Sequence, residues 1–322
     1  MAEARTYNVQ NVLNGHPSAS LELNLKIALA FEKGFKGYKA GVIKVEEEGK
    51  SFYFPFVTIA SKIKTAESLP FSWHSELNID SDTNAKEVIA AIKKELKASV
   101  IMFSSMTHLN SKLHEALIAS GFEYEEKQSD ILELRSQSFD EIFASRFSVK
   151  VRNQCRKALK SGMTIGLKKS EQSVEEYYKL YVEATQTWGK KTPPYEKAFF
   201  KELILNNEEV DFWVAELDEK FLGGVIVIKY DGWLYYWSGM INREFSSLCI
   251  NNGLLHEALK FYSATKQYDY FNFGPSETLG SVKKFKESWG TSSFLHHHYI
   301  WKSTGYKTVY KPLQKLKSIL KK

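Results

Sequence analysis

A hairpin followed by a helix, a strand, a second helix and a second strand occurs twice along the 322-residue chain, and this repeated order is the strongest constraint on its fold. In the first half, apolar and aromatic runs at 38–45 and 51–59 flank a polar turn, which predicts the hairpin. The other elements of this half are expected to be a helix with apolar residues Val88, Ile89, Ile92 and Leu96, a strand at 99–103, a helix at 110–120 and a strand at 130–134.

The second half repeats the order after two helices of its own. Its elements are expected at 173–187 and 195–206 (helices), 210–217, 221–230 and 233–240 (strands), about 246–266 (a helix capped by Ser246 or Ser247), 268–273 (strand), 279–289 (helix) and 293–301 (strand). The fold class is therefore α/β, or α+β, with two similar domains built on twisted mixed sheets. We place these domains at 1–145 and 146–305, with a basic tail at 306–322.

Composition excludes several classes of protein. Hydrophobic residues make up 43% and charged residues 25% of the chain, which excludes a disordered or low-complexity protein. The chain has no apolar run of the ~18 residues that a bilayer span needs, and its first residues lack the apolar centre of a signal peptide. We therefore expect a cytoplasmic protein. Cys155 and Cys249 are far apart in the sequence and are expected to be reduced, packed thiols.

The net charge of +6 is concentrated in two segments. Residues 143–170 carry eight Lys or Arg and residues 302–322 carry seven Lys, and neither segment contains Asp or Glu. Such segments in an otherwise acidic chain favour an anionic partner. In the tail, one side carries the apolar residues Leu313, Leu316, Ile319 and Leu320, which suits a helix on the inner, anionic face of a membrane or a helix docked on the protein itself.

The first basic segment contains a predicted helix at 148–162. At 100° per residue, Arg152, Arg156 and Lys160 form a ridge, and Lys150 adds a further cation. Arginine binds phosphate oxygens through two parallel hydrogen bonds, so this ridge suits a phosphorylated ligand. Two alternatives stay open, a solvated helix face and a non-catalytic module that binds RNA or a lipid headgroup.

The last predicted helix contains a lysine in an unusual position. Lys286 borders the apolar face formed by Phe285 and Trp289, whereas Lys283 and Lys284 point away from it. A partly desolvated ammonium at this place can stabilise a developing oxyanion or hold a phosphate. The alternative is a side chain that extends along the apolar surface and ends in water.

Aromatic residues fill the predicted strand at 233–240. They are either strand core or part of a ligand site, in which the hydroxyls of Tyr235 and Tyr236 would contact an oxyanion or an amine near a split in the sheet. No general base is evident, and Asp269 and Glu277 are the only candidates that we name.

The three consecutive histidines at 296–298 do not predict a metal site. They lie in a strand pattern, where alternate side chains face opposite sides, so the three cannot bind one ion from one face. The chain also lacks a cysteine or carboxylate set beside them. We expect no metal and no tightly bound cofactor.

Several motifs together resemble the FemAB-like (Fem-type) peptidyl and aminoacyl transferases. The segment 148–162 resembles their linker helix, and 236–240, Tyr-Trp-Ser-Gly-Met, is similar to the third strand of their second domain. The segment 271–274, Phe-Asn-Phe-Gly, followed by 282–290, Val-Lys-Lys-Phe-Lys-Glu-Ser-Trp-Gly, resembles their closing signature. The chain departs from the family at Asn272, where Asp is usual, and at Trp289, where Phe is usual. It also shows no heptad-patterned helical arm.

The resemblance implies two tandem GNAT-like domains and a transferase that forms an amide bond. In the family, the acceptor is a cell-wall precursor that bears a diphosphate, and the donor is an aminoacyl-tRNA. On matching positions, Arg152 and Arg156 would hold the acceptor phosphates, with Lys150 beside them. Phe285 and Lys286 would lie at the reacting carbonyl or at the tRNA end. The resemblance therefore implies peptidoglycan or cell-envelope biogenesis as the setting.

The donor is less certain, because many GNAT domains use acyl-CoA. Such domains bind the CoA pyrophosphate on a glycine-rich loop before the central helix. The corresponding segment 241–253 has only Gly253, inside the helix pattern, and 79–85 has no glycine and two Asp. Standard CoA binding is therefore disfavoured, and an acyl-CoA-dependent N-acyltransferase with a degenerate loop is the alternative enzyme.

Overall fold

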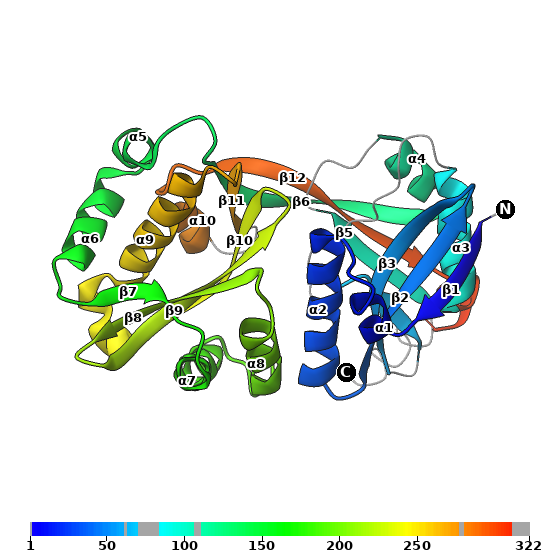
Figure 1. Cartoon of the computed structure of the whole chain (residues 1–322), viewed down its shortest axis with the longest axis horizontal. Coiled ribbons are helices and arrows are strands. Elements are labelled where there is room, and N and C mark those ends of the chain that lie inside the picture. The colour runs from blue at the N-terminus through cyan, green and yellow to red at the C-terminus, as the bar shows by residue number, and fades with distance from the viewer. Residues whose placement is uncertain (1, 61–62, 70–83, 106–110, 277–279, 311–322) are drawn as a thin grey trace, which may run out of the picture. The chain divides into compact units, whose positions relative to one another are not determined.

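The computed structural model describes residues 2–60, 63–69, 84–105, 111–276 and 280–310 (Figure 1). The chain divides into two compact units, and each contains strands of a mixed β-sheet with helices packed against them. This arrangement confirms the expected α/β class.

The first compact unit comprises residues 1–127 and 296–322. Its elements are β1 (Glu3–Tyr7), α1 (Val9–Leu13), α2 (Ala19–Gly34), β2 (Tyr38–Glu47), β3 (Lys50–Ile59), β4 (Thr65–Glu67), α3 (Ala85–Leu96), β5 (Val100–Ser105), α4 (Ser111–Ala119) and η2 (Tyr306–Tyr310). Successive residues of β2 face opposite sides of the sheet. Val42 packs with Leu25 of α2, and Ile43 packs with Val88 and Ile89 of α3. Helices therefore cover both faces of this sheet.

The second compact unit comprises residues 128–295. Its elements are α5 (Phe139–Ser145), α6 (Val149–Leu159), β7 (Thr164–Leu167), α7 (Glu171–Thr187), α8 (Lys197–Leu205), β8 (Val210–Leu217), β9 (Lys220–Tyr230), β10 (Trp233–Ile241), η1 (Arg243–Leu248), α9 (Ile250–Thr265), β11 (Tyr270–Pro275) and α10 (Gly280–Glu287). Two long strands, β6 (Phe122–Glu133) and β12 (Ser292–Lys302), run from one unit into the other.

Helices also cover both faces of the second sheet, whose strands lie in the order β6-β11-β10-β9-β8-β7. Neighbouring residues of β8 show this, because the ring of Phe212 contacts Tyr177 of α7 and the ring of Trp213 contacts Tyr262 of α9. Figure 1 shows α7 and α8 on one side of these strands and α9 on the other. Cys155 of α6 is fully buried among the α9 side of this core.

The division differs from the boundaries expected at residues 145 and 305. The first segment of the first unit ends at Lys127, and its second segment begins at His296. Residues after His296 belong to it because β12 pairs with β5 from His297↔Ser105 to Lys302↔Val100. The end of an apparent second-domain strand thus packs with the first unit. Of the expected tail, residues 306–310 form η2, and 311–322 lie outside the described residues.

One helix start also differs from expectation. Ser246 and Ser247 do not cap α9, because residues 243–248 form the separate turn η1, which is capped by the side chain of Asn242. The residue before α9 is Cys249, in a left-handed conformation with φ +56°. Most other expected elements of the second half are confirmed within a few residues, and β7 is an addition.

Candidate active site

The strands β10 and β11 separate at the middle of the second sheet. They pair in parallel through Trp233↔Tyr270, Leu234↔Phe271 and Tyr235↔Asn272, and the recorded pairing ends there. Beyond this point, β10 carries an irregularity between Tyr236 and Ser238 in its pairing with β9. In open α/β sheets, such a split places the strand ends around a crevice that ligands can use.

The turn at the end of β11 holds the buried Lys286. Gly274 has φ +76°, and its carbonyl and that of Pro275 accept hydrogen bonds from Lys286 Nζ at 2.7 and 2.8 Å. Gly274 N in turn donates to Asn272 Oδ1 at 2.7 Å. Lys286 is only 5% exposed, whereas Lys283 and Lys284 are exposed. The burial expected from the helical wheel is therefore confirmed, and the side chain does not extend to open water.

The electrostatics of this site depend mainly on burial. Desolvation lowers the pKa of Lys286 to about 8, and Asp130 of β6, whose Oδ2 lies 3.9 Å from Nζ, opposes part of this shift. Asp130 is 3% exposed and accepts a hydrogen bond from Ser276 Oγ. An ammonium has three donors, and two of them are used by backbone carbonyls. The third can serve a ligand.

Of the two predicted tyrosines, only Tyr235 lies at this turn. A methyl group built on Gly274 would be 3.6 Å from Tyr235 Oη and 4.0 Å from Lys286 Nζ. Tyr236 faces the other side of the strand, where its ring contacts Phe271 and Phe273 at centroid distances of 6.5 and 6.0 Å. Burial raises the pKa of both Tyr235 and Tyr236 to about 12, so both hydroxyls remain protonated near neutral pH.

The remaining candidates lie in different places. Phe285 is half-buried against Trp289, at a centroid distance of 6.2 Å, and so supports the apolar side of α10. Asp269 precedes β11, at the end opposite Gly274, and forms an ion pair with Arg135. Glu277 lies outside the described residues. The structure therefore does not bring Asp269 to Lys286.

The basic residues of α6 do not form a single group. Arg152 Nη1 donates to the carbonyls of Ala144 and Phe147 at 2.8 and 2.5 Å, so it holds the end of α5. Lys150 is exposed and lies 160° around the helix from Arg152, at about 100° per residue. Arg156 lies one turn further along α6 on the same face as Arg152, and it lines a surface pocket.

That basic pocket has a volume of about 540 Å³. Its lining residues come from α6, the residues after it, and the end of η1: Asn153, Arg156, Lys157, Lys160, Ser161 and Leu248. Arg156 donates to Asn153 Oδ1 at 3.1 Å, and its guanidinium carbon lies 5.6 Å from the ring centroid of Phe143. The lining contains three cations and no carboxylate, which favours an anionic ligand.

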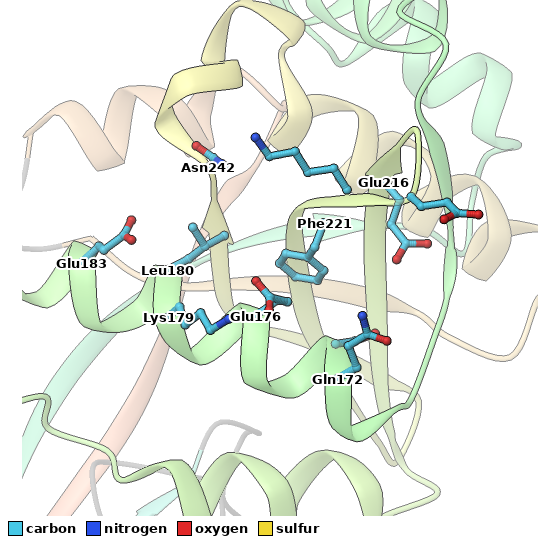
Figure 2. Close-up of a pocket in the computed structure, with 11 residues that line it drawn as sticks. Gln172, Glu176, Lys179, Leu180, Glu183, Glu216, Phe221 and Asn242 are labelled. Carbon is cyan, nitrogen blue, oxygen red and sulfur yellow. Dashed lines mark hydrogen bonds and ion pairs between the residues drawn. The ribbon is translucent and has the colours of Figure 1, made fainter.

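A second pocket, of about 330 Å³, has the opposite character (Figure 2). It lies between α7 and the β8–β9 hairpin, and its charged lining residues are Glu176, Glu183, Glu216, Glu219, Lys179 and Lys220. Three of these charges are already matched, since Lys179 pairs with Glu176 and Glu216 pairs with Lys168, each at 2.6 Å. This pocket does not favour a phosphate.

Gly253 has a packing role in α9. A methyl group built on it would lie 2.8 Å from Ile165 Cδ1 and 3.1 Å from Ala158 Cβ, so glycine permits the close approach of α6 and β7 to α9. It therefore does not form a flexible phosphate loop. In the first unit, most of the segment expected to correspond to this loop, 79–83, lies outside the described residues.

The described part of the chain contains no group of three or more His, Cys, Asp and Glu side chains arranged to bind a metal ion. It also contains no helix that is long and apolar enough to cross a bilayer.

Comparison with known proteins extends these observations. Residues 145–287 match the family described as an acetyltransferase (GNAT) domain. The crystal structure of FemX is similar over 95% of this chain and 99% of that chain, with a TM-score of 0.73 and 14% sequence identity. The chain has a Fem-type tandem GNAT fold. No curated protein sequence matches the chain.

Two other solved structures share the Fem-type fold at lower similarity. One is the C-terminal domain of a putative lysylphosphatidylglycerol synthetase from Agrobacterium fabrum, with a TM-score of 0.60, 10% identity, and coverage of 92% of this chain and 91% of that one. The other is a tandem GNAT protein from the clavulanic acid biosynthesis pathway, with a TM-score of 0.55, 10% identity, and coverage of 94% and 98%. At these identities the similarity shows the fold alone.

Sequence reasoning missed several residues of the site. Asp130 was assigned only to a strand, and nothing in its local pattern shows that it approaches Lys286 from another element. Gly274 followed by Pro275 is a turn signal, and it could have predicted the carbonyls that hold the ammonium. Lys157 belongs to the basic segment, but its place beside Arg156 depends on how η1 packs.

Proposed function

We propose that this chain is an acyl- or aminoacyltransferase of the Fem type, which forms an amide bond on an amine of a phosphorylated precursor related to the cell envelope. The observation that carries the proposal is the placement of Lys286, a buried ammonium held by two carbonyls at the split of the sheet. The Fem-type fold and the GNAT family match support the class of reaction.

The proposed chemistry is a nucleophilic acyl transfer. The amine nitrogen of the acceptor attacks the activated carbonyl carbon of the donor, and a tetrahedral oxyanion forms. The third N–H of Lys286 stabilises this oxyanion. Collapse of the intermediate forms the C–N bond and breaks the C–O bond of an aminoacyl ester or the C–S bond of a thioester. The proton lost by the amine ends on the leaving oxygen or sulfur.

The other residues have supporting roles in this proposal. The protonated Tyr235 hydroxyl, next to the Gly274 turn, contacts the oxyanion or the amine. Phe285 keeps the ammonium desolvated. Tyr236 acts by packing, because it lies on the opposite face of β10. Arg156 contacts the phosphates of the acceptor.

The donor is either an aminoacyl-tRNA or an acyl-CoA. We favour an aminoacyl ester because the residues around Gly253 form packed helix, with no glycine-rich phosphate loop. The match of residues 145–287 to an acetyltransferase domain favours the second candidate, an acyl-CoA-dependent N-acyltransferase.

Mass spectrometry of reaction mixtures tests the proposal. The full chain is incubated with charged tRNAs or acyl-CoAs, together with nucleotide-linked and lipid-linked amino-group acceptors. We expect one acceptor to gain the mass of the transferred acyl group, and we expect Lys286→Ala to abolish that gain. Turnover that is unchanged in Lys286→Ala would refute the role of Lys286. Anion binding with no product from any donor would instead support a non-catalytic module.

A further inference from the structure

The turn that holds Lys286 depends on a buried asparagine. Asn272 Oδ1 accepts the hydrogen bond from Gly274 N, and the next two carbonyls, of Gly274 and Pro275, then both point to Lys286 Nζ. Gly274 adopts the left-handed conformation that this turn requires. The side chain of Asn272 therefore helps to hold the turn whose carbonyls bind the ammonium.

The amide of Asn272 is not fully satisfied. Asn272 is 1% exposed, and its Nδ2 atom is buried with no hydrogen-bond partner among the described residues. The amide cannot be flipped, because Gly274 N needs the carbonyl oxygen as its acceptor. A buried polar group without a hydrogen-bond partner destabilises a fold, so the use of asparagine at this position calls for a reason.

Aspartate is the natural comparison, because it has nearly the same shape and accepts the same Gly274 hydrogen bond. Its second oxygen, however, would put a buried negative charge where Asn272 has a neutral amide. The property that asparagine has and aspartate lacks is neutrality. Tyr235 and Asn272 are register partners on β10 and β11 and face the same side, so a charge at position 272 would lie at the Lys286 site.

The groups around Lys286 make such a charge important. Among the described residues, the titratable groups that face Lys286 from the packed elements are Asp130 of β6, 3.9 Å away, and the protonated Tyr235 of β10. On α10 itself, Lys283, Lys284 and Glu287 are exposed. A second carboxylate, at position 272, would add negative charge to this site and weaken the attraction of the ammonium to an oxyanion.

We propose that Asn272 is a positioning residue for Lys286: its Oδ1 fixes the Gly274–Pro275 turn, and its neutral amide keeps a second negative charge away from the ammonium. This inference deepens the proposed function and depends on it for its catalytic meaning. The structural part can be measured without any substrate.

The test follows the side-chain Cε signal of Lys286 by NMR during a pH titration. The full chain is labelled with ¹³C-lysine, and the Lys286 signal is identified by its loss in Lys286→Met. We expect Asn272→Asp to raise the titration midpoint by about 1 pH unit relative to wild type, because a nearby opposite charge favours the protonated form. Asp130→Asn is expected to lower the midpoint, and the signal of Lys201, which pairs with Glu171 and Glu175, is the internal control. An unchanged midpoint in Asn272→Asp would overturn the role of neutrality.

Asn272→Ala tests the turn and keeps the inference falsifiable if Asn272→Asp does not fold. This variant is neutral but cannot accept the Gly274 hydrogen bond, so we expect the Lys286 signal to shift and its midpoint to change. A spectrum identical to wild type would overturn the role of Oδ1. The inference and the proposed function can fail separately. A raised midpoint in a chain that transfers no acyl group refutes only the function, and transfer that requires Lys286 with an unmoved midpoint refutes only the inference.

Discussion

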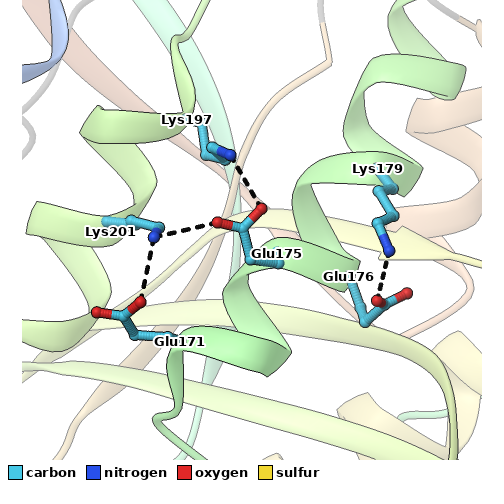
Figure 3. Close-up of polar contacts among 6 residues, drawn as sticks. All are labelled: Glu171, Glu175, Glu176, Lys179, Lys197 and Lys201. Atoms are coloured by element: carbon cyan, nitrogen blue, oxygen red, sulfur yellow. Dashed lines mark hydrogen bonds and ion pairs between the residues drawn. The ribbon is translucent and has the colours of Figure 1, made fainter.

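Lys201 and Lys286 lie in the same compact unit, and their different surroundings give the two ammonium groups different properties. On α7 and α8, Lys201 Nζ lies 3.3 Å from Glu171 Oε2 and 3.1 Å from Glu175 Oε1 (Figure 3). These carboxylates raise the pKa of Lys201. Lys286 donates to two neutral carbonyls, its carboxylate neighbour Asp130 is 3.9 Å away, and burial lowers its pKa to about 8. Surface pairs of the first kind contribute little to stability, whereas a desolvated ammonium can act on a substrate.

The largest expected difference between the two groups is in catalysis. Lys286→Met should lower the rate constant of acyl transfer by about 10²–10³-fold, the usual effect of removing an oxyanion donor. Lys201→Met, the matched control, should leave the rate unchanged. Single-turnover kinetics with the product identified by mass spectrometry would measure both rate constants. Equal rate constants in the two variants would contradict a catalytic role of Lys286.

The pH dependence of stability should differ in sign. Folded Lys286 loses its proton above pH about 8, whereas an unfolded lysine keeps it to pH about 10.5. The unfolded state therefore binds more protons between these values, and the stability of wild type should rise with pH relative to Lys286→Met. The full difference is roughly 3 kcal/mol. Urea unfolding at pH 7.5 and pH 10 would measure it.

Lys201 provides the opposite case for the same experiment. Its pKa is raised in the fold, so its contribution to stability is present below the unfolded pKa and is lost at higher pH. A rise in stability from pH 7.5 to pH 10 that is equal in wild type and Lys286→Met would contradict the proposed desolvation.

Arg156 and Lys160 line a pocket that contains no acidic residue, so they can be compared with cations that have acidic neighbours. Changing Arg156 and Lys160 to Glu should weaken the binding of pyrophosphate or a nucleotide-linked acceptor by about tenfold or more, because each lost charged hydrogen bond contributes 1.5–3 kcal/mol. The matched control, Lys179→Glu with Lys220→Glu, changes the same charge in the pocket of Figure 2. Calorimetry at two salt concentrations would decide, and equal losses in both double variants would refute a specific phosphate site.

The smallest effect is expected in the ion pairs of Figure 3. Glu175→Gln removes a partner of both Lys197 and Lys201, whose Nζ atoms lie 3.0 and 3.1 Å from it. Because these pairs are near the surface, the free energy of unfolding should fall by less than about 1 kcal/mol. Acyl transfer should be unaffected. A larger loss in a denaturant titration would show that this network is a structural requirement.

Local patterns in the sequence predicted much of the second unit. The apolar run of β8 and the helical spacing in α6 and α7 were sufficient, because β8 is buried on both faces and each helix buries one face of its own. The wheel argument placed Lys286 correctly for the same reason. The Fem-type resemblance predicted the tandem fold, which the similarity to FemX confirms.

The remaining features depend on contacts between distant segments. The first residues of β6 are polar, so the local pattern did not predict a strand of 12 residues. The end of β12 pairs with β5 of the first unit, so the compact units differ from the expected domains. Asp130 reaches Lys286 from more than a hundred residues away along the chain. Arg152 serves the end of α5, and no charge pattern distinguishes that role from phosphate binding.

The titration midpoint of Lys286 in the unmodified full chain tests the central claim most directly. An NMR titration of its Cε signal should give a midpoint near pH 8, far below the ordinary lysine value of 10.5. A midpoint at or above 10.5 would show that this ammonium is hydrated or paired like those of α7 and α8, and it would contradict the account of the site.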